Sequence, residues 1–391
     1  MTTSIIITLT LLLIVAYVFD LSASKTKIPS VILLLSVGMG LSKLSNYFTI
    51  QIPDLNSVLP VLGTIGLILI VFEGSLELDV DKTKIPIITK TILFSVLSIL
   101  CISLVLAYVL SYYFNENYVK SLVNALPLAI ISSAIAIPSV SNLSAKVKEF
   151  VTYESSLSDI FGVLIFNFFT INQVINFEAF ITFGLDIFII IVITVIISLF
   201  LTYLLSKIKH HVKFLPILLM LIFIYNVAKI WHLPSLIIIL LYGIFLGNIN
   251  KISFLGRFIN SEILHTEIVK LRELNTEFAF LIRALFFLLF GFLINFNELI
   301  SIEALVWALG ICSLIYLSRF LLLKMFKLEL KPFLFIAPRG LITILLLLSI
   351  PNELKIVDFT KSIFIQVIVL SAVMMMFGMI FSKNKVSQVG E

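Results

Sequence analysis

Long apolar runs, separated by short polar loops, recur along the whole chain. A helix needs about 20 apolar residues to cross a hydrocarbon core of about 30 Å, whereas strands of an outer-membrane barrel alternate over about ten residues. The runs do not alternate in that way. The pattern therefore predicts an all-α polytopic membrane protein.

The loops divide the chain into thirteen predicted transmembrane helices. These lie near residues 4–20, 29–43, 58–78, 85–114, 122–144, 151–173, 178–206, 214–229, 233–249, 274–295, 301–323, 331–350 and 362–382. The stretch 250–273 mixes apolar and basic residues, which predicts an amphipathic helix lying at the membrane interface.

The 27 Lys and Arg residues are distributed unevenly between the two sides of this arrangement. Residues near a span end, Lys90 and Arg319 among them, are counted with the adjacent loop. On this count twenty belong to every second loop and the C-terminal tail, five to the other loops, and only Arg283 and Arg339 to the interior of the spans. Basic loops mark the cytoplasmic side. We therefore expect a multi-pass protein of the plasma (inner) membrane, with its N-terminus outside and its C-terminus in the cytoplasm.

Composition excludes several functional classes. Only 13% of the residues are charged and mean hydropathy is +1.18, whereas about a quarter of a soluble domain is charged. This excludes water-soluble enzymes, and we expect no enzymatic activity. The net charge of +5 comes from short loops and the tail after the last span is brief, so we expect neither a nucleic-acid partner nor a nucleotide. Cys101 and Cys312 lack metal-ligand spacing, and we expect no cofactor.

Two predicted helices carry helix-breaking residues in mid-membrane. The fifth contains small residues including Ser133 and Ala134 before Pro138, and the twelfth contains Pro338 and Gly340. Proline removes a helical hydrogen bond, and the freed backbone groups must be satisfied by protein or cavity water. Paired interruptions of this kind indicate the binding site of a transporter.

The two broken helices are seven spans apart, so equivalent helices must cross the membrane in opposite directions. This spacing predicts a six-helix inverted repeat with two broken, crossing helices inside one transporter unit, residues 1–391. The first repeat would be 1–173, the linker helix 178–206 and the inverted second repeat 214–382.

Five ionisable residues lie well inside the spans: Glu73, Glu154, Asp159, Arg283 and Arg339. A charge there costs about 2.5 to 3.5 kcal/mol, which makes each one a functional or structural candidate. Helix rise places Asp159 near the midplane. A carboxylate deprived of water can hold a proton or an alkali cation but not both, so competition at one site would produce exchange. In the alternative reading, Asp159 only caps a helix or pairs with an arginine.

Hard oxygen ligands around Asp159 would suit Na⁺, Li⁺ or K⁺. We expect Asp159, Glu154 and the Ser155 hydroxyl to act as metal ligands, together with carbonyls freed at the first break. Glu73 is expected to form a structural ion pair with Arg339, because a lone buried charge would be destabilising. Arg283 is expected to support the crossing by donating to its carbonyls.

Four segments, in this order, resemble motifs of the cation:proton antiporter superfamily, and most of all its NhaP-type Na⁺/H⁺ antiporters. They are Phe72-Glu73-Gly74-Ser75-Leu76, Glu154-Ser155-Ser156-Leu157-Ser158-Asp159, Ile282-Arg283-Ala284-Leu285-Phe286-Phe287 and Arg339-Gly340. The resemblance implies that Asp159 carries the proton and the cation, and that the binding residues are Asp159, Glu154, Ser155, Ser158 and Ser133.

The resemblance also implies a homodimer, in which a core bundle from 58–173 and 274–382 moves against a dimerisation domain made of the remaining helices. Two positions depart from the family pattern. Ser133-Ala134 replaces the Thr-Asp of the first broken helix, which is more like the potassium-efflux branch, and Ser158 replaces the Asn before the aspartate. Because Ser158 cannot ionise, we expect electroneutral exchange of one H⁺ for one Na⁺.

Other readings remain open at this point. A K⁺/H⁺ antiporter or potassium-efflux-like transporter would use the same residues. An organic-anion symporter or an uncoupled channel would belong to different classes, with Arg283 as the basic residue available to an anion. Membrane lipid, monovalent cations and protons are the expected partners in the favoured reading.

Overall fold

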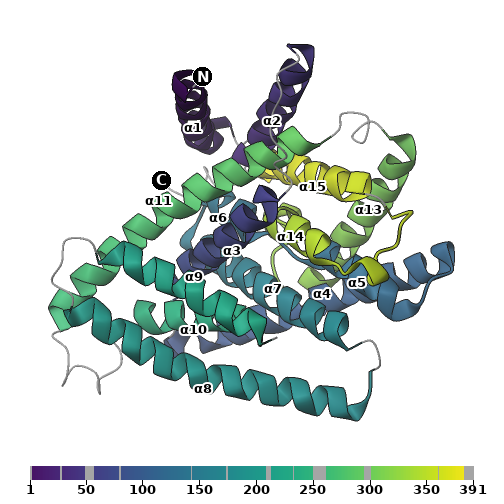
Figure 1. Cartoon of the computed structure of the whole chain (residues 1–391). Helices are drawn as coiled ribbons and strands as arrows, with labels where there is room; N and C mark the ends of the chain where they lie inside the picture. The colour runs from purple at the N-terminus through teal and green to yellow at the C-terminus, as the bar shows by residue number, and fades with distance from the viewer. Residues whose placement is uncertain are drawn as a thin grey trace, which may run out of the picture.

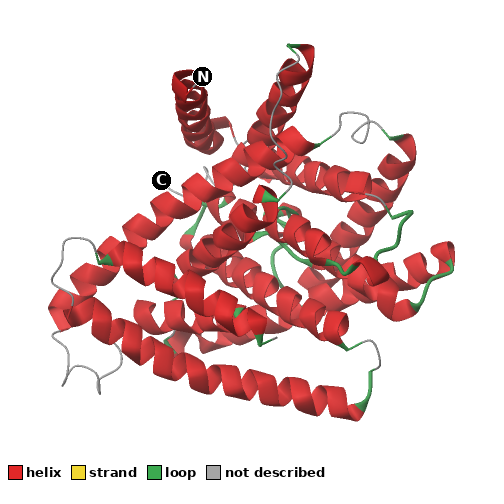
Figure 2. Ribbon diagram, in the orientation of Figure 1, coloured by secondary structure: helices red, strands yellow, loops and turns green. Residues whose placement is uncertain are grey.

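The computed structural model describes residues 2–26, 29–48, 57–78, 81–141, 143–172, 175–207, 213–231, 233–249, 261–294, 301–359 and 361–382. In these ranges the protein consists of helices joined by loops, and Figure 2 shows no strand among them. The long helices lie across one another around a central group of shorter ones (Figure 1).

The helices correspond to the thirteen predicted spans. They are α1 Thr2–Thr26, α2 Ser30–Tyr47, α3 Val58–Leu76, α4 Ile85–Phe114, α5 Tyr118–Ala129, α6 Ser133–Ser139, α7 Ala145–Ile171, α8 Phe177–Lys207, α9 Phe214–Ile230, α10 Leu236–Gly247, α11 Ser261–Leu293, α13 Ile302–Met325, α14 Leu341–Ser349 and α15 Lys361–Ser382. Three short 3₁₀ turns accompany them: η1 Lys82–Lys84, η4 Phe333–Phe335 and η5 Asn352–Leu354. Eight of the described helices are long and apolar enough to cross a membrane, with α5 and α6 counted together.

Local sequence explains where several helices begin and end. Asn117 precedes α5, and its Oδ1 accepts a hydrogen bond from the N–H of Val119, as expected of a cap. Ser301 caps α13 in the same way through the N–H of Ala304. Asn115 ends α4 in the left-handed region, at φ 54°, a conformation that Asn tolerates better than most residues.

The prediction of an interfacial helix at 250–273 is wrong for the second half of that range. Residues 261–273 form the beginning of α11, which continues without interruption to Leu293. Ile268 and Leu271 within this part are buried, so these two apolar side chains face protein. Residues 250–260 lie outside the described part of the chain.

Both predicted broken helices are interrupted, but the first break does not lie at Pro138. The helix stops after Ala129, and Ile130 and Ser132 are extended before α6 begins at Ser133. Pro138 lies in the last turn of α6. In the second, residues 336–340 are non-helical between η4 and α14, and contain Pro338 and Gly340 as predicted.

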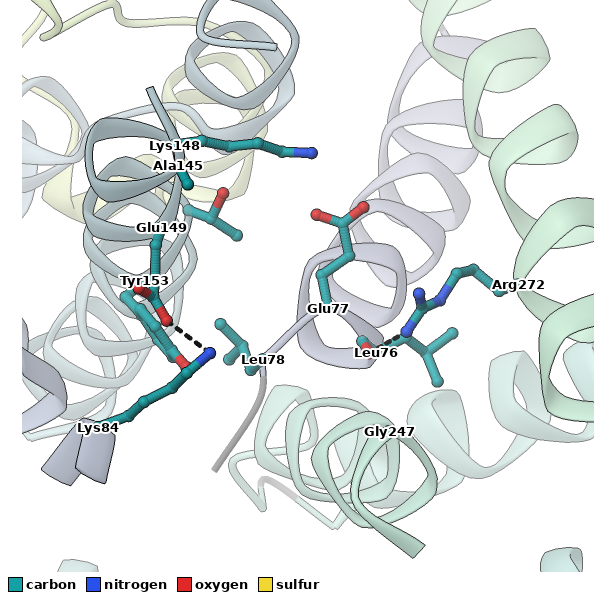
Figure 3. A pocket seen from close by; sticks show the side chains of 11 residues that line it. Leu76, Glu77, Leu78, Lys84, Ala145, Lys148, Glu149, Tyr153, Gly247 and Arg272 are labelled. Carbon is teal, nitrogen blue, oxygen red and sulfur yellow. Dashed lines mark hydrogen bonds and ion pairs between the residues drawn. The ribbon is translucent and has the colours of Figure 1, made fainter. Parts of the chain in front are cut away.

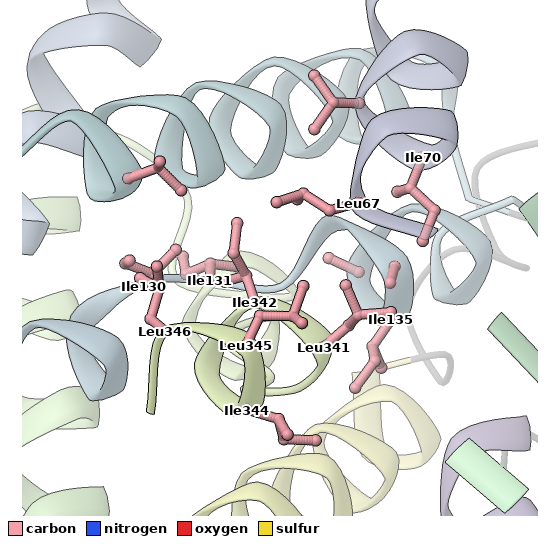
Figure 4. Packing of buried hydrophobic residues seen from close by; sticks show 14 of the residues in the cluster. Leu67, Ile70, Ile130, Ile131, Ile135, Leu341, Ile342, Ile344, Leu345 and Leu346 are labelled. Atoms are coloured by element: carbon pink, nitrogen blue, oxygen red, sulfur yellow. The ribbon is translucent and has the colours of Figure 1, made fainter. Parts of the chain in front are cut away.

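Long helices enclose the two interrupted segments. α7 packs against α4, α5 and α6, while α3 packs against α10, α11 and α14. Apolar side chains fill the space around the crossing, including Leu67 of α3, Ile131 of the first break and Leu345 of α14 (Figure 4). The crossing is therefore the centre of the buried core.

Candidate ion-binding site at the crossing of the broken helices

The backbone at the first break is held by partners from distant parts of the chain. In a continuous helix, the N–H groups of Ile131 and Ser132 would bond to carbonyls four residues earlier. Here Ile131 N–H donates to Ser158 Oγ at 3.0 Å, and Ser132 N–H donates to the Pro338 carbonyl at 2.9 Å. Ser158 thus positions the break, and the two broken segments meet backbone to backbone.

Gly340 allows the second broken segment to approach the first. A Cβ built at Gly340 would lie 2.6 Å from Ile135 Cδ1 and 2.9 Å from Ser132 Oγ. Both distances are too short for real side-chain contacts. The absence of a side chain at 340 is therefore a steric requirement of the crossing.

Asp159 lies on α7 directly beside the start of α6. Its side chain is 2% exposed, and its Oδ2 accepts a hydrogen bond from the Ser133 hydroxyl, while the Ser133 N–H faces the same carboxylate. Oδ1 has no hydrogen-bond partner, and no basic side chain in the described ranges forms an ion pair with this residue. The site therefore contains a buried carboxylate with one oxygen uncommitted.

Arg339 caps the carbonyls that the first break leaves without donors. Its Nε donates to the Leu128 carbonyl at 2.7 Å, its Nη2 to Ala129 at 3.4 Å and its Nη1 to Ala337 at 2.9 Å. The guanidinium thus lies at the C-terminal end of α5, where the helix dipole favours positive charge. Arg339 is fully buried.

The expected ion pair between Glu73 and Arg339 is wrong. Arg339 bonds to the carbonyls just described, whereas Glu73 is half-buried on α3, hydrogen-bonded by the Thr276 side chain and subject to the charge of Arg283. The pair was expected because a lone buried charge would be destabilising. The carbonyls at the break supply Arg339 with hydrogen-bond acceptors instead, so it needs no carboxylate.

Arg283 of α11 reaches a carbonyl of the first broken segment. Its Nη1 donates to the Ala134 carbonyl at 3.4 Å. In a helix that carbonyl would accept from the N–H of residue 138, but Pro138 has none. Arg283 therefore replaces the hydrogen bond that the proline removes.

Glu154 forms an ion pair with Arg319, which was expected to belong to a loop. Arg319 of α13 makes a bidentate pair with it, at 2.5 Å between Nη1 and Oε1 and 2.9 Å between Nη2 and Oε2. Arg319 Nε also donates to the Phe333 carbonyl at 2.6 Å, and its guanidinium lies 5.5 Å from the centre of the Phe94 ring. Both oxygens of Glu154 are engaged, so the structure removes it from the set of free cation ligands.

Ser155 shares a helix face with Asp159 but has its own partner. Its hydroxyl donates to the Val151 carbonyl at 2.8 Å and is fully buried. Of the five expected binding residues, the structure thus brings Ser133 into direct contact with Asp159, uses Ser158 to hold the break, and gives Glu154 and Ser155 other bonds. Arg319 lies within the predicted span 301–323, four residues before its end, and the apolar run that continues to Met325 was the signal that could have placed it inside the membrane.

A cavity of about 560 Å³ opens between α3, α7 and α11. Figure 3 shows Glu77 and Lys148 pointing into it from opposite walls, with Arg272 beside Leu76. Lys84 pairs with Glu149 at 2.8 Å, and Arg272 Nη2 donates to the Leu76 carbonyl at 2.5 Å. The cavity reaches Thr152 and Tyr153 of α7, and Asp159 lies beyond them along the same helix.

Comparisons with known proteins agree with the fold described above. The fold is similar to that of the sodium proton antiporter MjNhaP1 from Methanocaldococcus jannaschii. A structure of that protein at pH 8 gives a TM-score of 0.70 at 20% identity, covering 97% of this chain and 99% of that one. An electron-microscopy structure of it gives 0.73 at 18% identity and covers both chains fully.

The predicted antiporter fold is therefore confirmed. No curated protein sequence matches the chain. The family model described as sodium/hydrogen exchanger, transmembrane, matches residues 9–383, nearly the whole length. This chain belongs to the sodium/hydrogen exchanger family.

Proposed function

We propose that the protein exchanges a monovalent cation, most readily Na⁺, for a proton by competition at Asp159. The observation that carries the proposal is the uncommitted Oδ1 of this buried carboxylate at the crossing of two broken helices. A protonated carboxyl is neutral, and a carboxylate with a bound alkali cation is neutral as well. Either occupant therefore offsets the cost of burying the charge, but the two cannot bind together.

The oxygen atoms near Asp159 fit a small alkali cation. The Ser133 hydroxyl donates to Oδ2, and rotation of its hydrogen would present a lone pair to a cation bound by the carboxylate. The carbonyls of Ile130 and Ile131, to which Arg339 does not donate, are further hard ligands of the kind that Na⁺ and Li⁺ accept. Glu154 is left out of this ligand set because Arg319 holds both of its oxygens.

We infer electroneutral exchange of one H⁺ for one cation. Ser158 precedes Asp159 and cannot ionise, so a single carboxylate carries the exchange. The inward proton gradient would then expel sodium. Exchange in proteoliposomes should not respond to an imposed voltage at zero pH gradient, and a voltage response would refute this stoichiometry.

An inverted repeat is supported by matched contacts in the two halves. Ser158, in the sixth span, accepts from the Ile131 N–H at the first break. Ser371, in the thirteenth, accepts from the Arg339 N–H at the second break, at 3.0 Å. We propose that residues 1–173 and 214–382 are these repeats, that the core bundle moves against a dimerisation domain in a homodimer, and that the N-terminus faces outward from the plasma (inner) membrane.

The proposal is tested by reconstituting the protein with a pH-sensitive dye inside vesicles. Adding Na⁺, Li⁺ or K⁺ outside should drive protons out of the lumen, and the order of the three rates reports cation preference. Asp159→Asn should fold and insert normally but show no exchange. Ser103→Ala is the matched control, because this buried hydroxyl bonds only within α4. Retained exchange in Asp159→Asn would overturn the assignment.

A further inference from the structure

We propose that three oxygen atoms on one face of α7, those of Thr152, Ser156 and Asp159, form the route between the cavity and the binding carboxylate. The inference rests on the proposed function and deepens it, because it assigns a passage to the cation and the proton. Thr152 lines the cavity, Asp159 is the proposed end of the route, and Ser156 lies between them.

Helix geometry places the three side chains in a row. Their spacings of four and three residues put them on the same face of α7. The rise of about 1.5 Å per residue separates Thr152 from Ser156 by about 6 Å, and Ser156 from Asp159 by about 4.5 Å. These steps are short enough for a partly hydrated Na⁺, or for water that carries a proton, to pass from one oxygen to the next.

All three side chains are at most 5% exposed, and each has an oxygen without a protein partner: Thr152 Oγ1, Ser156 Oγ and Asp159 Oδ1. Several other buried serine and threonine hydroxyls in the described ranges bond back to their own helix. Ser155 and Thr194 do so, to the Val151 and Ile190 carbonyls. Because an unsatisfied buried hydroxyl is costly, an uninterrupted row of them indicates a surface that solvates something.

The facing helix packs closely against the middle of this row. Gly74 of α3 lies opposite Ser156, and a Cβ built there would be only 2.7 Å from Ser156 Oγ, with the next atom, Ile137 Cδ1, at 3.7 Å. Any larger residue at 74 would occupy the space in front of the hydroxyl. We therefore include Gly74 as the residue that sets no side chain against the row at Ser156.

The charges at the cavity end are largely engaged with neighbouring groups. Lys84 pairs with Glu149, and Arg272 donates to the Leu76 carbonyl. Glu77 is exposed and points into the cavity opposite Lys148 (Figure 3). A cation entering here meets the Glu77 carboxylate first and the hydroxyl of Thr152 next.

The first test is chemical access to introduced thiols. In a protein with Cys101 and Cys312 replaced by Ser, Ser156→Cys is exposed to Ag⁺, a thiol-binding monovalent cation, on either side of sealed vesicles. We expect reaction from the cavity side at least about tenfold faster than at the control Thr194→Cys, and protection by saturating Na⁺. Thr194 is equally buried, but on α8 and away from the row.

The second test measures exchange by variants that lose the hydroxyl, with Ser156→Thr as the size match for Ser156→Val. Thr152→Val and Ser156→Val should slow exchange by about tenfold or more, since each step loses a hydrogen-bonding oxygen worth about 1.4 kcal/mol. Ser156→Thr should retain most of the rate, and Gly74→Ala should slow it. Thr194→Val is the matched control and should exchange like the unaltered protein.

The outcomes separate the route from the proposed function. An unreactive Ser156→Cys, or a Ser156→Val variant that exchanges at the full rate, overturns the route while leaving the exchanger intact. If the unaltered protein exchanges no cation but Ser156→Cys still reacts from the cavity side with Na⁺ protection, the proposed exchange fails and the passage stands.

Discussion

The ion pair between Glu154 and Arg319 allows a quantitative prediction. Both side chains are 2% exposed, and two charged hydrogen bonds of 2.5 and 2.9 Å join them. Removing one partner leaves the other charge buried and unpaired, which costs about 3 to 5 kcal/mol. Arg319→Met and Glu154→Leu should each lower the free energy of unfolding by that amount.

The double variant should be more stable than either single one. Replacing both groups by apolar residues of similar size leaves no unpaired charge, and the main loss is the Arg319 bond to the Phe333 carbonyl, at about 1 to 3 kcal/mol. The pair Lys84–Glu149 is the matched control, because its side chains are 32% and 31% exposed. Breaking that pair should cost about 0 to 1 kcal/mol.

Unfolding of the purified protein by SDS titration from a mild detergent measures all of these free energies under one condition. We expect a large favourable coupling free energy between Glu154 and Arg319, and almost none between Lys84 and Glu149. If the two single losses simply add in the double variant, Glu154 and Arg319 do not interact as described.

Three further predictions concern the crossing. Arg339→Ala should destabilise the protein by several kcal/mol, because three carbonyl partners are lost at about 1 to 3 kcal/mol each, and Arg339→Lys should recover only part of this in the same SDS titration. Gly340→Val should prevent the two broken segments from meeting, which would appear as loss of both folded yield and exchange, while Gly310→Val on α13, where a Cβ has open space, should not. Arg283→Gln should be less harmful to stability in a Pro138→Ala background, because the new N–H at 138 can donate to the Ala134 carbonyl; equal effects in both backgrounds would contradict this account.

The fold was largely predictable because membrane crossing imposes a simple rule on composition. Every spanning helix must be apolar for most of its length, so its existence can be read locally. The two interruptions were also predictable as segments with helix breakers. The position of the first break was not, because it depends on Ser158 and the Pro338 carbonyl, which come from distant parts of the chain.

The site was predictable in its central residue but not in its pairings. Depth in the membrane singled out Asp159, but depth says nothing about which helix faces which. The partners of Arg339 are carbonyls that exist as acceptors only because the neighbouring helix is broken. Arg319 was counted with the following loop, although it lies within the predicted span 301–323, because lysines at 324, 327 and 331 follow it closely.

The most direct test of competition at Asp159 is calorimetric titration of the purified protein with Na⁺ across a pH series in buffers of different ionisation heat. The account predicts that each bound Na⁺ displaces up to one proton, that the apparent Kd rises about tenfold per pH unit on the acid side, and that Asp159→Asn binds no Na⁺. A Kd independent of pH, or Na⁺ binding retained by Asp159→Asn, would contradict it.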